Sequence, residues 1–226
     1  MNRGYYITGT DTAVGKTLVS VALLNALRAG GKTAVGMKPV ASGCEQTVDG
    51  LRNDDALELQ AASAPMPAYA LVNPFALPAA TAPQIAAQLA GVKVSLAPIL
   101  AAYRTLANSA DAVVVEGVGG WLAPLADALE QAQLAAALQL PVLLVVGMKL
   151  GCLNHARLTE RAIVADGLPL AGWVGNAVDP GLQFSDAYAD LLRGALQSPC
   201  LGLLPHTRDR APATFATYLH LPLAGR

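Results

Sequence analysis

The sequence predicts an α/β fold in which a doubly wound, mainly parallel sheet carries helices on both faces. First, three short runs are apolar over nearly their whole length, at residues 113–116, 142–147 and 171–176. Such runs are typical of parallel strands buried on both faces. Second, helical patterns alternate with these runs along the chain, as in doubly wound folds. Third, 54% of the 226 residues are hydrophobic and 14% are charged, so the chain can bury a large core. We expect one domain over residues 1–226.

The remaining strands and the helices follow in order along the chain. Three further segments are expected to be strands, at residues 5–8, 33–38 and 200–204. Helices are expected over the segments with helical apolar spacing, which are 17–29, 95–108, 130–139, 154–166 and 184–196. The first helix ends at Gly30-Gly31, a natural C-terminal stop, and Ser95 is the expected N-cap of the second. Right-handed crossovers then place the ligand-binding loops at the carboxyl ends of the strands.

The least regular stretch is 64–83, which has prolines at 65, 67, 74, 78 and 83. Because proline lacks a backbone N–H and disfavours helix and sheet interiors, we expect a loop here that covers one edge of the ligand site. The segment after Pro205 has no pattern that supports a prediction.

Charge, hydropathy and cysteine usage exclude several classes of function. The net charge is −1, so the chain lacks the basic field that would attract nucleic acid or an anionic membrane. No run approaches the roughly 18 apolar residues of a membrane span, and the N-terminus lacks the apolar stretch of a signal peptide. The three cysteines, Cys44, Cys152 and Cys200, form no CxxC pair. We therefore expect reduced thiols in a cytoplasmic protein, with no nucleic-acid and no membrane partner.

The strongest motif is GTDTAVGKT at residues 9–17, between the first strand and the first helix. Gly15 lets backbone N–H groups approach phosphate oxygens, and the helix start adds further N–H groups and its positive dipole end. Lys16 offers a charge to the β- and γ-phosphates, and Thr17 a hydroxyl to Mg²⁺. The common pattern has a glycine at position 10, where this chain has Thr10 after Gly9. The motif predicts nucleotide binding along the loop, by Ala13, Val14, Gly15, Lys16, Thr17 and Leu18.

Carboxylates and a second lysine follow neighbouring strands. Glu116 ends an apolar strand and precedes Gly117-Val118-Gly119-Gly120, so it is expected to face the ligand crevice and bind Mg²⁺, with phosphate or substrate close to the glycines. Asp54 and Asp55 stand at the expected start of a helix, and either could be a ligand or could only complement the helix dipole. Lys38 ends the second strand and could pair with a carboxylate or add a charge beside a transferring phosphate.

Six segments together resemble the dethiobiotin synthetase family over nearly the whole chain. They are GTDTAVGKT at 9–17, MKPVASG at 37–43, GLRNDDAL at 50–57, VVVEGVGGWLAPL at 113–125, VGMKLGCLNHA at 146–156 and LAGWVGN at 170–176. The resemblance implies a P-loop NTPase-like fold and a homodimeric ligase of biotin biosynthesis that uses Mg²⁺ and ATP. Its substrates would be 7,8-diaminopelargonate and CO₂. A carbamate forms on one amine, attacks the γ-phosphate to give a carbamic–phosphoric anhydride, and closes to a cyclic urea with the second amine.

The resemblance also implies roles for individual residues. Lys16 and Lys38 resemble the lysines that stabilise the transferring phosphoryl group, and the Mg²⁺ ligands would be Thr17, Asp55 and Glu116, which selects Asp55 over Asp54. Further nucleotide contacts would come from Gly117, Val118, Gly119, Asn176, Ala177, Pro205, His206 and Thr207. Substrate contacts would come from Thr12 and Ser42 and, at the carboxylate end bound by the partner subunit, from Gly151, Cys152, Leu153, Asn154 and Tyr188.

The chain departs from the family pattern at two positions, and two alternative functions stay open. The family often has an acidic residue at the position of Ala13 and a polar one at that of Ala177, which puts recognition of the base in doubt. One alternative is a P-loop amidating synthase, although the chain has no glutaminase-like cysteine–histidine arrangement. The other is a partner-switching ATPase, although such proteins carry a lysine where this loop has Asp11. Phosphate release that depends on the diamine would separate the enzyme from the switch.

Overall fold

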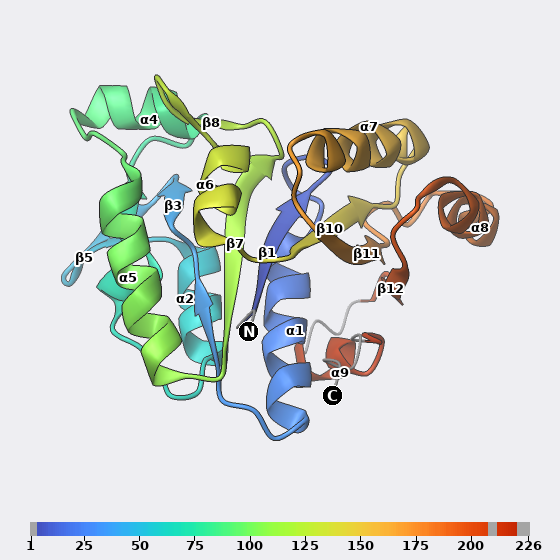
Figure 1. Cartoon of the computed structure of the whole chain (residues 1–226), viewed down its shortest axis with the longest axis horizontal. Helices are drawn as coiled ribbons and strands as arrows, with labels where there is room; N and C mark the ends of the chain where they lie inside the picture. The colour runs from blue at the N-terminus through green and yellow to red at the C-terminus, as the bar shows by residue number, and fades with distance from the viewer. Residues whose placement is uncertain (1–3, 208–211, 221–226) are drawn as a thin grey trace.

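The computed structural model describes residues 4–207 and 212–220, and its centre is a parallel sheet (Figure 1). The strand order is β12-β11-β10-β1-β7-β2, with every neighbouring pair parallel. All six expected strands are present in this sheet, with these bounds: β1 Gly4–Gly9, β2 Ala34–Met37, β7 Ala112–Gly120, β10 Val142–Gly147, β11 Leu170–Asn176 and β12 Cys200–Leu204.

Helices cover both faces of the sheet, which confirms the doubly wound prediction. Residues that alternate along the strands belong to different cores: Val114 packs with α1 (Lys16–Ala29) and α2 (Asp54–Ala62), whereas Val113 and Val115 pack with α5 (Leu96–Ser109) and α6 (Gln131–Leu138). A third core lies between β10, β11 and the helices α7 (Cys152–Ala165) and α8 (Ser185–Ala195). The five helices expected from apolar spacing are therefore all present, with ends that shift by a few residues.

The strand register brings the carboxyl ends of β1, β2 and β7 together. Met37 lies beside Val115, and Ile7 lies beside Glu116. The pairing of β1 with β7 then shifts, so that Gly9 lies beside Gly120 and residues 117–119 form an irregularity in the ladder. The phosphate loop, Lys38 and Glu116 thus converge at one edge of the sheet, where ligands bind in open α/β folds.

Residues 64–83 do not form the simple loop expected from their prolines. Tyr69–Val72 forms the short helix α3, and Phe75–Leu77 forms β6, which pairs in parallel with β3 (Val40–Ser42). Pro83 begins α4 (Pro83–Ala90), a position where the missing N–H costs no hydrogen bond. The prolines of this segment therefore lie between short elements and at a helix start, where they interrupt no hydrogen bonds of a helix or strand.

Several short elements were not predicted from apolar spacing. They are two hairpins, β4 (Glu45–Thr47) with β5 (Gly50–Arg52) and β8 (Pro124–Ala126) with β9 (Leu129–Glu130), and the last described helix, α9 (Pro212–Ala216). Phe215 and Leu219 join the core that α1 forms with the sheet, so the segment after Pro205 is part of the fold where it is described. Within the described ranges, no helix is long and apolar enough to cross a membrane.

Candidate active site

The phosphate loop has the backbone that an anion-binding turn requires. Gly15 has a φ of +88° and forms the N-cap of α1, and a Cβ placed on it would lie 2.1 Å from Nδ2 of Asn176. Only glycine fits such a position. No side chain caps the first turn of α1, which leaves its N–H groups available to a phosphate. Lys16 folds back over the loop and donates from Nζ to the carbonyl of Asp11 at 3.0 Å.

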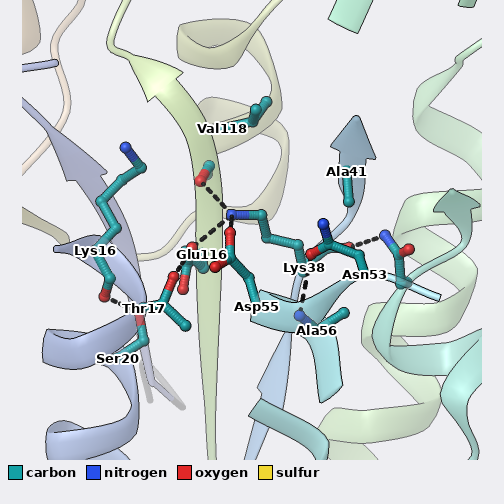
Figure 2. A network of polar contacts seen from close by, with 12 residues as sticks. Lys16, Thr17, Ser20, Lys38, Ala41, Asn53, Asp55, Ala56, Glu116 and Val118 are labelled. Carbon is teal, nitrogen blue, oxygen red and sulfur yellow. Dashed lines mark hydrogen bonds and ion pairs between the residues drawn. The ribbon is translucent and has the colours of Figure 1, made fainter. Parts of the chain in front are cut away.

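Four predicted side chains meet beside this loop (Figure 2). Lys38 Nζ lies 2.8 Å from Oδ2 of Asp55 and 2.5 Å from Oε1 of Glu116. The Thr17 hydroxyl donates to the same Oε1 at 3.0 Å. The side chains of Lys38 and Glu116 are 4% and 0% exposed, whereas that of Asp55 is 43% exposed. Asp54 is on the exposed side of the same helix turn and has no part in this cluster of Thr17, Lys38, Asp55 and Glu116.

The charges in this cluster are mutually stabilising. Burial alone would lower the pKa of Lys38, but Glu116 and Asp55 outweigh it and raise that pKa above its ordinary value. Burial tends to raise the pKa of Asp55, and Lys38 reverses this and lowers it. Burial lowers the pKa of Lys16 to about 8, and the nearby charge of Lys38 acts in the same direction. Lys38 is therefore a firmly charged ammonium, whereas Lys16 loses its proton at a lower pH than an ordinary lysine does.

The donor set fits Mg²⁺. Among the described residues, no group of three His, Cys, Asp or Glu side chains is placed to hold a metal ion. Mg²⁺ does not need one, because it is usually held by one or two carboxylates together with water and substrate phosphates. Thr17, Asp55 and Glu116 offer hard oxygens, and Oε2 of Glu116 is buried without a hydrogen-bond partner. A buried acceptor of this kind is costly unless a donor or a cation approaches it.

A cavity of about 200 Å³ lies next to the phosphate loop. It is lined by residues predicted to contact the nucleotide, of which Ala13, Gly15 and Leu18 belong to the phosphate loop, and Asn176, Ala177, Pro205, His206 and Thr207 were expected around the base. Nδ2 of Asn176 donates to the carbonyl of Val14 at 2.9 Å, which ties the cavity to the loop. Val178 and Phe215 also line it, and the sequence reading missed both. Val178 could have been predicted because it directly follows Ala177, but nothing in the sequence pointed to Phe215.

The predicted substrate residues fall into two separate regions. Cys152 is buried in the third core, and Leu153 and Tyr188 pack against it, so the start of α7 and one face of α8 are brought together. Gly151 has a φ of +94° and no side chain caps α7, while the N–H groups of Cys152 and Asn154 donate to the carbonyls of Lys149 and Gly151. These elements flank β10 and β11, whereas Ser42 ends β3 on the side of β2 and β7 (Figure 1).

Thr12 lies in the phosphate loop, close to Gly119. A Cβ on Gly119 would be 3.8 Å from the Thr12 hydroxyl oxygen, so the loop and the segment 117–120 face each other. Beneath that segment lies Gln131, a residue that sequence reasoning missed. Its buried side chain donates from Nε2 to the carbonyls of Val118 and Gly120 and accepts a hydrogen bond from the Tyr6 hydroxyl. These bonds fix the carbonyls of Val118 and Gly120.

The comparisons with known proteins agree with this geometry. A family model described as an AAA domain matches residues 3–214. The chain is 58% identical over 218 residues to a protein of Xanthomonas oryzae pv. oryzae, covering 96% of this chain and 97% of that protein. It is 57% identical over 217 residues to a protein of Xylella fastidiosa, covering 96% of each. Both relatives are named ATP-dependent dethiobiotin synthetase BioD.

Similarity to solved structures extends to much more distant proteins. A ParA family ATPase from Chlorobium tepidum superposes with a TM-score of 0.56 at 12% identity, covering 97% of this chain and 91% of that one. The MinC:MinD complex of Aquifex aeolicus gives a TM-score of 0.59 at 16% identity, with 94% and 85% covered. At these identities the likeness concerns the fold alone, which is that of the P-loop ATPases.

Proposed function

The chain belongs to the ATP-dependent dethiobiotin synthetase family, and from this premise we propose that the site between β1, β2 and β7 carries out the ring-forming carboxylation of 7,8-diaminopelargonate. The activity is ATP-dependent synthesis of dethiobiotin in biotin biosynthesis, which makes the protein a ligase. The single observation that carries the placement of the reaction is the buried cluster of Thr17, Lys38, Asp55 and Glu116 beside Lys16.

The proposed reaction has three steps. One amine of the substrate adds to CO₂ and loses a proton, which gives a carbamate. A carbamate oxygen attacks the γ-phosphorus of ATP, and the bond to the β–γ bridging oxygen breaks to release ADP. The second amine then attacks the carbonyl carbon of the mixed anhydride, the bond to the phosphate oxygen breaks, the amine nitrogen loses a proton, and a cyclic urea remains with free phosphate. None of these steps needs a protein nucleophile.

The residues of this chain supply charge and alignment. Phosphoryl transfer requires the neutralisation of developing negative charge and an in-line geometry more than covalent help from the protein. We assign this to Lys16 and Lys38, with the free N–H groups of α1 beneath the phosphates. The carbamate is itself an anion, so the same cations offset its repulsion from ATP. Thr12, which faces segment 117–120, and Ser42 are assigned to the amine end of the substrate.

We assign Mg²⁺ to Thr17, Asp55 and Glu116. The support is their hard oxygen donors and the unpartnered buried Oε2 of Glu116. When bound, the ion would neutralise negative charge on the phosphates. The base of ATP is assigned to the cavity formed by Asn176, Ala177, Pro205, His206 and Thr207.

We further propose a homodimer in which residues 151–154 and Tyr188 of one subunit bind the substrate carboxylate for the site of the other. The start of α7 has no side-chain cap, and it lies toward the β10–β11 side of the sheet, away from Ser42, so a site that uses both regions draws on two subunits. We also propose a single domain over residues 1–226, because the hydrophobic cores are shared by elements from both ends of the described chain. We propose a cytoplasmic location, which the three free cysteines support.

Product analysis tests the proposed reaction. The protein is incubated with MgATP, bicarbonate and 7,8-diaminopelargonate, and the product is identified by mass spectrometry. We expect the cyclic urea and an equal amount of phosphate, with neither formed when the diamine is left out. Phosphate release that is indifferent to the diamine would contradict the proposal and favour a partner-switching ATPase.

Nucleotide discrimination should be weak, because Ala177 offers only a methyl group to the base cavity. Its N–H donates to the Leu204 carbonyl at 3.0 Å, and its own carbonyl lies 3.1 Å from Nδ1 of His206. Loss of one hydrogen bond to the base reduces discrimination by roughly 1–2 kcal/mol. Steady-state comparison of ATP with CTP and GTP measures this, and Ala177→Asn is the matched variant that should discriminate more sharply. A preference for ATP over both by many thousandfold would show the idea to be wrong.

Nucleotide binding should take up a proton in mildly alkaline solution. The pKa of Lys16 is about 8 in the free protein, so at about pH 8.5 much of this lysine is neutral. A bound polyphosphate favours the ammonium and raises the pKa, so a proton is taken from solvent. Titration calorimetry in two buffers of different ionisation enthalpy measures the uptake. The Lys16→Arg variant keeps its charge throughout and should show no such uptake; equal uptake by both proteins would contradict the assignment.

A further inference from the structure

We propose that Tyr69 is a positioning residue that holds Lys38 and Asp55 at their working separation. The inference rests on the function proposed for those two residues. Tyr69 lies in α3, within the proline-containing stretch that the sequence predicted as a loop, and it does not touch the charge cluster itself. It acts through hydrogen bonds to the two chain segments from which Lys38 and Asp55 project.

The first branch of hydrogen bonds leads to Lys38. The Tyr69 hydroxyl donates to Oδ1 of Asn73 at 3.2 Å, and Nδ2 of Asn73 donates to the Lys38 carbonyl at 2.7 Å. The Lys38 N–H donates to the Val72 carbonyl at 2.8 Å. Asn73 is 4% exposed and Lys38 is 3% exposed, so these bonds are shielded from water. Both peptide groups of Lys38 are therefore held by the α3 segment.

The second branch leads to Asp55. The same Tyr69 oxygen accepts the backbone N–H of Asn53 at 2.8 Å. Asn53 is the N-cap of α2, and its Oδ1 accepts the N–H of Ala56 at 3.2 Å. Asp55 stands between these two residues in the first turn of α2, so the direction of its side chain depends on where this turn begins. One hydroxyl thus joins the start of the Asp55 helix to the backbone of Lys38.

The hydroxyl is itself held in place. The guanidinium carbon of Arg52 lies 4.3 Å from the centroid of the Tyr69 ring, a cation–π geometry that fixes the ring face. Tyr69 also packs against the core formed by α1 and α2. Burial raises the pKa of the Tyr69 phenol, so the group stays protonated and can donate to Asn73 while it accepts from Asn53. Tyr69→Phe removes both hydrogen bonds and keeps the ring for Arg52.

The separation matters because both partners face the reacting phosphate in the proposed site. Lys38 and Asp55 are 2.8 Å apart, and a misplacement of about 1 Å by a residue outside the chemistry can cost about 10²-fold in rate. We expect Tyr69→Phe to lower kcat by about 10- to 100-fold, and to raise the half-saturating Mg²⁺ concentration by at least about threefold. The KM for ATP should stay within about twofold of the unaltered protein, since the phosphate loop and base cavity are untouched.

Tyr5→Phe is the matched control. It removes a phenol oxygen from the amino end of β1, at the opposite end of the strand from the phosphate loop, and should change neither kcat nor the Mg²⁺ dependence. A double-mutant cycle adds Asn73→Ala. If Tyr69 acts through Asn73, the combined loss in kcat is smaller than the product of the two single losses.

Two outcomes would overturn the inference. One is a Tyr69→Phe protein with a lowered unfolding temperature but with kcat and Mg²⁺ dependence unchanged, which is what a purely structural tyrosine would give. The other is a Tyr69→Phe effect on kcat that is as large in a Lys38→Ala background as in the unaltered protein. Failure of the proposed function would look different, because Lys38→Ala itself would then retain turnover or the unaltered protein would form no cyclic urea.

Discussion

Lys38→Ala is expected to lower turnover by about 10²–10³-fold, the usual cost of removing one group that stabilises developing charge. It is also expected to reduce the free energy of unfolding by about 3–5 kcal/mol, because it leaves the fully buried carboxylate of Glu116 without its partner. Lys16→Ala and Glu116→Ala should lower turnover to a similar extent. Steady-state rates of cyclic urea formation and denaturant unfolding measure the two effects separately.

The double variant Lys38→Ala/Glu116→Gln separates the two roles of the lysine. It removes the unpaired buried charge, while the amide oxygen of Gln can still accept the Thr17 hydroxyl, as Oε1 of Glu116 does at 3.0 Å. Much of the lost stability should therefore return, and the lost turnover should not. Near-normal turnover in Lys38→Ala alone would remove Lys38 from the mechanism.

Subunit mixing is expected to restore activity from two inactive proteins. A chain with Lys38→Ala is mixed with a chain with Tyr188→Ala, and the subunits are allowed to exchange. In a shared-site dimer one of the two sites in each heterodimer carries both lesions and the other carries neither, so each heterodimer should recover about half of normal activity. The physical reason is that a long, flexible diamine acid needs both ends fixed before its two nitrogens reach one carbon.

Heterodimer formation has to be measured alongside the rate, for example by native mass spectrometry of chains with different tags. Heterodimers that form and stay inactive would show that each chain holds its own complete site. A protein that remains monomeric at assay concentration and is fully active would equally contradict the shared site. Mixing each inactive chain with itself provides the baseline.

The sequence predicted the sheet well because its strands are buried on both faces. A run such as Val142–Gly147 is apolar at every position and could not lie at a solvent-exposed edge without cost. The phosphate loop was predicted equally well, because its motif is continuous in sequence and the backbone at Gly15 requires glycine. Asp55 could not be separated from Asp54 by residue type alone; the resemblance selected it, and the structure shows its bond to Lys38.

The residues missed by the sequence reading are joined by contacts that have no period along the chain. Gln131 meets Tyr6 across 125 positions, and Asn73 meets Lys38 across 35. Proline density argued for a loop at 64–83, yet β6 forms there because the hydrogen bonds of Phe75–Leu77 come from residues that keep their N–H groups. The pairing of β6 with β3 could not be predicted without knowing where β3 lies in the fold.

Phe215 has a consequence for proteins cut within this chain. Lys16, Lys38, Asp55 and Glu116 all precede residue 120, whereas one wall of the base cavity comes from α9. Cleavage between β12 and α9 would leave the groups proposed to bind phosphate in place and remove that wall. The shortened chain is therefore expected to bind ATP less tightly than the intact one.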